Sequence, residues 1–236
     1  MRRSNALCAS LAFVLACGAI TAALPHVAFG RQAVSATQQP STVPHDTRPT
    51  SQPYSGDLSI FESKDRDKRL QIDRVMDLLG ITSGTTAADI GAGSGWFTVR
   101  AAARVGSTGK VFAEDINPEA VSYIRNRIAT AKITNVEVTL GSPDDPRLPA
   151  DAVDAVLMLK VYHEIAHPPA FLAHLRPALK PHAKVGIIDR NGNGADHGVQ
   201  ASVVIREMKD AGFRLSGTYD FTKADGQDYF LIFEPR

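Results

Sequence analysis

The stretch Ala88-Asp89-Ile90-Gly91-Ala92-Gly93-Ser94-Gly95-Trp96-Phe97-Thr98 decides the fold, because a short apolar run meets a glycine-rich turn there and a helical pattern begins. Residues 86–90 are expected to form a buried strand. Three glycines within five residues allow backbone conformations, and a close approach of a ligand, that a Cβ atom would prevent. The helix expected after them points its free N–H groups at whatever lies over the loop. This order of elements predicts a nucleotide-binding corner.

The spacing of the glycines separates two classes of ligand. A dinucleotide-binding fingerprint is G-x-G-x-x-G, with the third glycine where helix and strand pack closely. Trp96 occupies that position, and Gly95 comes one residue earlier, which disfavours an NAD-dependent oxidoreductase. The form D-x-G-x-G-x-G, made by Asp89, Gly91, Gly93 and Gly95, resembles motif I of the class I S-adenosylmethionine (SAM) methyltransferases. A tight turn without a ligand is the alternative.

The first 30 residues have the organisation of a secretory signal peptide. Arg2 and Arg3 precede an uncharged apolar run over residues 6–24, and small residues follow before Arg31. An uncleaved membrane anchor and a lipidated cysteine stay open as alternatives. The domain is therefore expected to be exported, either periplasmic or secreted. Both cysteines lie in this segment, so a chain cleaved before Arg31 has no thiol for a disulfide or a metal.

Composition divides the remainder into two parts. Residues 31–56 are rich in Gln, Ser, Thr and Pro and are expected to form a disordered linker. Residues 57–236 are long enough for one domain with a single core. Without Arg2 and Arg3 the basic residues fall from 26 to 24 against 25 acidic ones, a formal charge of −1. That balance gives no basic surface for nucleic acid.

The rest of the chain alternates between the helix and strand periods. A first helix is expected over 64–79, capped by Ser63 and ended by Gly80, with the alternative that Phe61-Glu62-Ser63, Arg66 and Asp67 fold over a cofactor as a lid. The fold class expected is a Rossmann-like, seven-stranded, mostly parallel α/β sheet with helices on both faces and a C-terminal antiparallel hairpin. Strands are expected at 86–90, 110–114, 136–140, 155–159, 184–188, 213–219 and 229–233, and the later helices at 97–105, 120–131, 170–179 and 203–211.

Two further groups of polar residues follow strands. Asp115 lies 20 residues after Gly95 at the end of the second strand, where an acid accepts both ribose hydroxyls of a nucleotide. Capping the next helix is the alternative for Asp115, and Glu114 should point to the other face. Tyr162 and His163 follow the fourth strand and are expected nearest to a methyl acceptor, unless they only begin a helix.

A metal site is not expected. Asp189, Asp196 and His197 follow the fifth strand, but three scattered ligands without helical or hairpin spacing are weak support for one.

From about Phe61 to Phe233 the chain resembles class I SAM-dependent methyltransferases, and in particular predicted bacterial methyltransferases with export signals. Those sequences carry runs similar to residues 61–67, 88–97 and 140–146. The resemblance implies SAM as cofactor, a small-molecule acceptor, and Tyr162 or His163 to orient that acceptor or take its proton. The cofactor-binding residues implied are Asp89, Gly91, Ala92, Gly93, Gly95, Asp115, Ile116 and Asp144.

Two points stay open within this resemblance. Asp144 comes later after Gly141 than the usual adenine-binding acid, so stabilisation of the turn is its alternative role. Export separates the domain from cytoplasmic SAM. The rival hypothesis is therefore an exported SAM-binding module that has lost the transfer reaction, because a fold alone does not fix a function.

Overall fold

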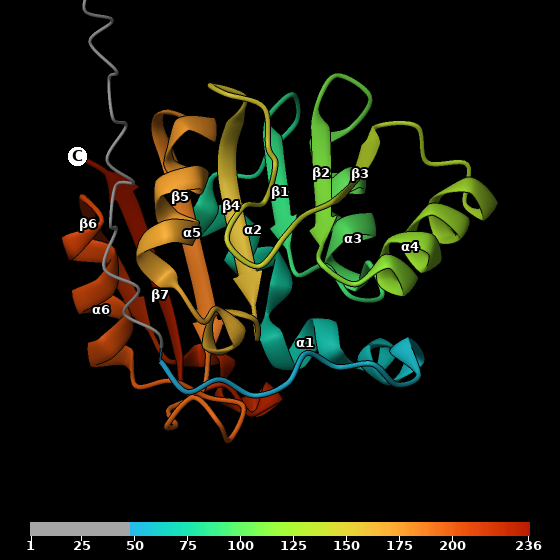
Figure 1. The fold of residues 1–236 in the computed structure, drawn as a ribbon. Coiled ribbons are helices and arrows are strands. Elements are labelled where there is room, and N and C mark those ends of the chain that lie inside the picture. Colours follow the sequence, from blue (N-terminus) through green and yellow to red (C-terminus); the bar gives the residue numbers. More distant parts are fainter. Residues whose placement is uncertain (1–47) are drawn as a thin grey trace, which may run out of the picture. The chain divides into compact units, whose positions relative to one another are not determined.

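The computed structural model describes residues 48–236, and the predictions for residues 1–47 lie outside this range. A single seven-stranded sheet with the order β3-β2-β1-β4-β5-β7-β6 forms its centre (Figure 1). The first five strands pair in parallel, and β7 pairs antiparallel with both β5 and β6. The expected fold class is confirmed. The strands are β1 Thr86–Ile90, β2 Lys110–Asp115, β3 Val136–Leu140, β4 Val153–Leu159, β5 Leu179–Asp189, β6 Phe213–Tyr219 and β7 Tyr229–Pro235.

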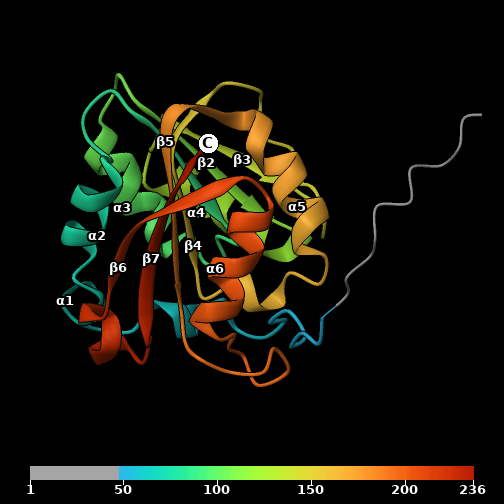
Figure 2. The same ribbon diagram turned by 90° about the vertical axis from the view of Figure 1, so that its left-hand side faces the viewer.

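Helices cover both faces of the sheet because both faces of its central strands are apolar. In β1, Ala87 packs with the cluster that contains α2 and α3, whereas Ala88 packs with the cluster that contains α5 and α6. This alternation follows from the two-residue period of a strand. Figure 2 shows the two groups of helices on opposite sides of the sheet. The helices are α1 Arg66–Leu70, α2 Ile72–Leu79, α3 Trp96–Val105, α4 Pro118–Thr130, α5 Pro168–Leu175 and α6 Ala201–Asp210.

The helix expected over residues 64–79 is in fact two helices. Gln71 has a φ of 52°, and this left-handed conformation interrupts the helix between α1 and α2. Asp65, not Ser63, is the N-terminal boundary residue, and the Ser63 hydroxyl accepts a hydrogen bond from Arg69 instead. Gly80 ends α2 in the left-handed conformation, as predicted.

The fifth strand is longer than its sequence indicates. It begins at Leu179, so residues 180–183 belong to β5 rather than to a turn after a helix. The pairing of β5 with β4 shifts register between Val153 and Ala155. Pro181 lies beside this irregularity, where its missing N–H does not interrupt a regular ladder.

The folded region begins before the predicted boundary at residue 57. The Arg48 guanidinium donates to the Glu207 carboxylate over 2.7 Å and lies 4.8 Å from the centre of the Tyr162 ring. Ser51 is buried. Residues 48–51 therefore pack on the domain, although their composition is that of a linker. Within residues 48–236 the structure has no helix that is long and apolar enough to cross a membrane.

Candidate active site

The glycine loop after β1 needs its glycines for two different reasons. Gly91, Gly93 and Gly95 have φ values of 65°, 54° and 72°, which side chains rarely adopt. At Gly91 a Cβ atom would also lie 2.1 Å from Val161 Cγ2, so glycine lets the end of β4 approach the loop. Gly95 is the residue from which α3 begins. The loop therefore lies between the ends of two neighbouring strands, with its backbone exposed to the pocket they enclose.

Asp115 fixes this loop from the end of β2. Its Oδ2 accepts a hydrogen bond from Gly93 N and its Oδ1 accepts one from Asn117 N, each over 2.8 Å. Burial raises the pKa of the Asp115 carboxyl, and these N–H donors oppose the rise. Asn117 caps α4, because its side-chain oxygen accepts a hydrogen bond from Glu119 N. Asp115 is thus free of the capping role and faces the glycine loop.

Asp89 is buried at the end of β1. Its carboxylate accepts a hydrogen bond from the Thr98 hydroxyl over 2.6 Å. Burial is the largest effect on this group and raises its pKa to about 7, with a smaller contribution from the neighbouring Asp115 charge. The two carboxyl groups predicted at the cofactor site are therefore close enough to influence one another.

A third buried acid, Glu114, lines the pocket and was not predicted as a site residue. Glu114 is buried, and its Oε1 has no hydrogen-bond partner. Desolvation, with a contribution from the Asp115 charge, raises the pKa of Glu114 to about 8. A Cβ atom at Gly141 would lie 1.8 Å from Glu114 Oε1, so the glycine that begins the turn after β3 leaves room for this carboxyl. Strand alternation alone gives no sign that both Glu114 and Asp115 border one pocket.

One pocket of about 370 Å³ joins the ends of β1, β2 and β4. Its volume falls in the range of about 300–1,000 Å³ that is usual for small-molecule sites. Of the residues predicted for the site, it brings together those that follow these three strands: Asp89, Gly91, Ala92, Gly93, Asp115, Ile116 and His163.

Three predicted site residues, Gly95, Tyr162 and Asp144, do not line this pocket. Tyr162 is fully buried, and its hydroxyl donates to the Glu207 carboxylate over 3.0 Å. The short helical turn after β4 thus directs Tyr162 away from the pocket and His163 into it, because the two side chains contact different partners. Asp144 accepts a hydrogen bond from His167 Nδ1 over 3.0 Å, which fits its alternative role in the turn.

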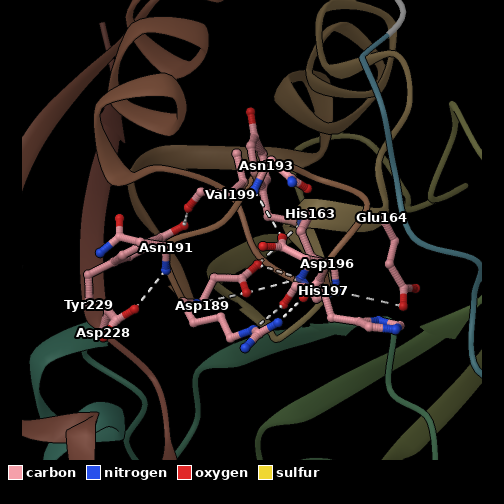
Figure 3. A network of polar contacts seen from close by, with 12 residues as sticks. His163, Glu164, Asp189, Asn191, Asn193, Asp196, His197, Val199, Asp228 and Tyr229 are labelled. Atoms are coloured by element: carbon pink, nitrogen blue, oxygen red, sulfur yellow. Dashed lines mark hydrogen bonds and ion pairs between the residues drawn. The ribbon is translucent and has the colours of Figure 1, made fainter.

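His163 is held by a buried acid from the neighbouring strand. Its Nδ1 lies 2.8 and 3.0 Å from the two oxygens of Asp189, and its backbone N–H donates to the same carboxylate. This contact occupies Nδ1, so Nε2 is the ring nitrogen that remains for a contact in the pocket. Figure 3 shows the network, in which Glu164 and His197 lie beside His163. Burial raises the pKa of the Glu164 carboxyl to about 7.

The segment before α1 covers the glycine loop. The Phe61 ring lies 3.6 Å from the position that a Cβ atom would take at Gly93. Glu62 pairs with Arg127 of α4 and accepts a hydrogen bond from the Ser94 hydroxyl over 2.7 Å. This arrangement fits the lid alternative for the region around Phe61. The sequence did not indicate that Pro53, Tyr54 and Leu58 also line the pocket, because their composition placed them in or beside a linker.

The comparisons with known proteins agree with this geometry. Residues 87–182 match a family model described as a methyltransferase domain. The chain is 31% identical over 112 residues to a demethylmenaquinone methyltransferase of Tropheryma whipplei, covering 48% of this chain and 44% of that protein. It is 32% identical over 112 residues to a 2-phytyl-1,4-naphtoquinone methyltransferase of Trichormus variabilis, covering 47% and 48%. The chain thus spans about half the length of these curated relatives.

A solved structure extends the similarity to most of the domain. A SAM-dependent methyltransferase from Aquifex aeolicus superimposes with a TM-score of 0.68 at 25% sequence identity, covering 75% of this chain and 95% of that one. The fold and the glycine-loop pocket define a methyltransferase of the Rossmann-like type. Residues 87–182 therefore form a methyltransferase domain, and residues 48–236 have a fold similar to that of the class I SAM-dependent methyltransferases.

Proposed function

We propose that this domain binds SAM at the glycine loop and transfers its methyl group to a small molecule held in the same pocket. The observation that carries the proposal is that one cavity contains the glycine loop, Asp89, Asp115 and the Nε2 side of His163. A nucleotide fits this end because the loop exposes backbone in conformations closed to side chains, and because Asp115 stands at the strand end where ribose hydroxyls are bound.

The chain's own residues need to position rather than to activate the cofactor. Bound SAM supplies an electrophilic methyl group on its sulfonium. Asp115 would accept hydrogen bonds from the ribose hydroxyls of SAM, and Asp89 would interact with its cationic amino group. The Phe61 segment limits access of water from above the loop. Alignment and exclusion of water are the two contributions that such a transfer requires.

We propose an apolar acceptor with one or two oxygen substituents. Leu58, Phe61 and Phe171 supply apolar walls, whereas His163 and Glu164 supply polar atoms at one end. His163 Nε2, oriented through Asp189, holds the oxygen of the acceptor in line with the methyl group. The names of the curated relatives describe quinone-type acceptors, and a hydroxylated aromatic ring has the shape and polarity of this pocket.

The test is calorimetric titration of the full-length chain with SAM and with S-adenosylhomocysteine, with NAD as the control. Binding of either sulfur ligand, but not of NAD, is expected. Transfer of radiolabelled methyl from SAM to 1,4-naphthoquinol then tests turnover. Binding without transfer to this or other hydroxylated rings would favour the non-catalytic binding module. Absence of binding would refute the proposal.

We also propose that residues 1–30 direct export, on the basis of their sequence alone. Cell fractionation of the full-length chain against a variant without residues 2–30 tests this. Equal distribution of the two forms would contradict it.

A further inference from the structure

The polar end of the pocket holds three side chains with metal-binding atoms from two separate segments. His163 and Glu164 follow β4, and His197 lies in the loop between β5 and α6. All three line the pocket, and their ligand atoms lie within 4.8 Å of one another. His163 Nε2 is 3.8 Å from Glu164 Oε1. Figure 3 shows the Glu164 carboxylate and the His197 ring on the same side of the network.

We propose that His163, Glu164 and His197 bind a divalent transition-metal ion, with zinc as the best match, at the acceptor end of the pocket. Two imidazoles and one carboxylate form a known ligand set for an open zinc site, in which further positions remain for an exogenous oxygen. This inference rests on the proposed function for the identity of that oxygen, which is the hydroxyl or carbonyl group of the acceptor.

Asp189 provides the support that a histidine ligand requires. Its carboxylate is fully buried behind His163 and receives the Nδ1 side of the ring. Metal-bound histidines almost always donate their second ring N–H to a carboxylate or carbonyl in this way, which fixes the tautomer and the ring orientation. The backbone N–H groups of His163 and Arg190 also donate to Asp189, over 3.2 and 2.9 Å. Nε2 is therefore fixed in place before any ligand arrives.

His197 is brought to the cluster by a strained but well-anchored backbone. It has a φ of 61°, a left-handed conformation that non-glycine residues rarely adopt. Arg190 holds it there by donating from Nε to the His197 carbonyl over 2.9 Å. The His197 ring consequently meets the His163 ring edge-on, with 5.9 Å between their centres. Asp189 and Asp196, which the sequence analysis considered as metal ligands, are not part of the cluster. Asp189 contacts His163 Nδ1, and Asp196 accepts a hydrogen bond from Asn193 N over 2.9 Å.

The three ligand atoms need to move only a short way to close on an ion. Zinc bonds of about 2.0–2.2 Å in tetrahedral geometry separate ligand atoms by about 3.3 Å. His163 is fixed, whereas the His197 side chain is exposed and the Glu164 side chain is 21% exposed. Rotations of these two side chains supply the contraction. Contact of the acceptor with His163 is then made through the ion rather than directly.

The experiment is titration of the full-length chain, without a polyhistidine tag and stripped with EDTA, with Zn²⁺ by calorimetry and with Co²⁺ by visible absorption. We expect one ion per chain, with Co²⁺ bands typical of low coordination number. His197→Ala should abolish this binding, and Glu164→Gln should weaken it at least tenfold. His174→Gln, which changes an exposed histidine outside the pocket, is the matched control and should bind as the wild type does.

The outcomes separate this proposal from the proposed function. SAM is titrated into the same EDTA-treated protein. Binding of SAM without stoichiometric binding of Zn²⁺ or Co²⁺, or metal binding that His197→Ala and Glu164→Gln leave unchanged, would overturn the metal site and leave the SAM site standing. Metal binding that both variants abolish, without SAM binding, would support the metal site and refute the SAM site. Near-ultraviolet circular dichroism of each variant shows whether a loss arises from misfolding.

Discussion

Replacement of Asp115 by alanine tests the centre of the cofactor site. In the structure the Asp115 carboxylate accepts two backbone N–H bonds of 2.8 Å, from Gly93 and Asn117. Loss of the carboxylate from the ribose hydroxyls should weaken SAM binding by about 1–3 kcal/mol, or roughly 5- to 150-fold. The two loop contacts predict a loss of about 1–3 kcal/mol in the free energy of unfolding as well.

Calorimetric titration with SAM, well below the unfolding temperature of the variant, separates the two effects. Urea unfolding without ligand gives the stability term. Asp144→Ala is the matched control because its carboxylate faces His167 outside the pocket, and its SAM affinity should stay within about threefold of the wild type. Wild-type affinity in Asp115→Ala, or an equal loss in Asp144→Ala, would show that Asp115 does not bind the cofactor.

Three further substitutions test separate parts of the site. Because the pKa of Glu114 is raised to about 8 in the folded protein, its protonated form contributes to the free energy of unfolding, and this contribution is complete below about pH 4.5. It is lost as the pH rises to about 8, and the total change in the free energy of unfolding is up to about 5 kcal/mol at 1.36 kcal/mol per pKa unit. Glu114→Gln should therefore gain stability relative to the wild type between pH 5 and 8.5 in urea unfolding, and a constant difference would contradict this. Phe61→Ala should weaken SAM binding by about 1–2 kcal/mol through lost apolar contact over Gly93; an unchanged calorimetric affinity would remove the lid role. Tyr162→Phe should cost about 0.5–1.5 kcal/mol of stability through the lost bond to Glu207 and leave methyl transfer intact; an inactive but folded variant would return Tyr162 to the catalytic site.

The sheet could be predicted because its signals are local and repeated. The parallel strands contain short apolar runs or, in β3, alternating apolar residues. Asn117 and Gly80 act at helix ends as their residue types suggest. The errors lie where a single residue departs from its usual conformation. Gln71 carries no sequence feature that marks a left-handed break. The packing of Arg48 on Glu207 joins residues 159 positions apart, a contact that composition cannot indicate.

The residues around the glycine loop were easier to predict from the sequence than those after β4. Asp89 and Asp115 are placed by strand ends at a fixed spacing from the glycines, so the sequence defines their neighbourhood. Tyr162 and His163 are adjacent in a short helical turn, where one residue of rotation decides which of them faces the pocket. Two contacts determine which residue faces the pocket: Asp189 contacts the His163 ring, and Glu207 accepts a hydrogen bond from the Tyr162 hydroxyl.

The topology explains why these two halves meet. Strand order reverses between β1 and β4, and an open α/β sheet forms its crevice at such a point, outside the carboxyl ends of the strands. The glycine loop leaves β1 on one side of this crevice, and His163 follows β4 on the other. Because β5 is parallel to β4 and next to it, its last residue, Asp189, comes beside His163. The same adjacency starts the loop that carries His197 at the crevice edge. The loop after β5 therefore reaches the pocket in which we propose that the acceptor binds, because His197 of this loop lines it.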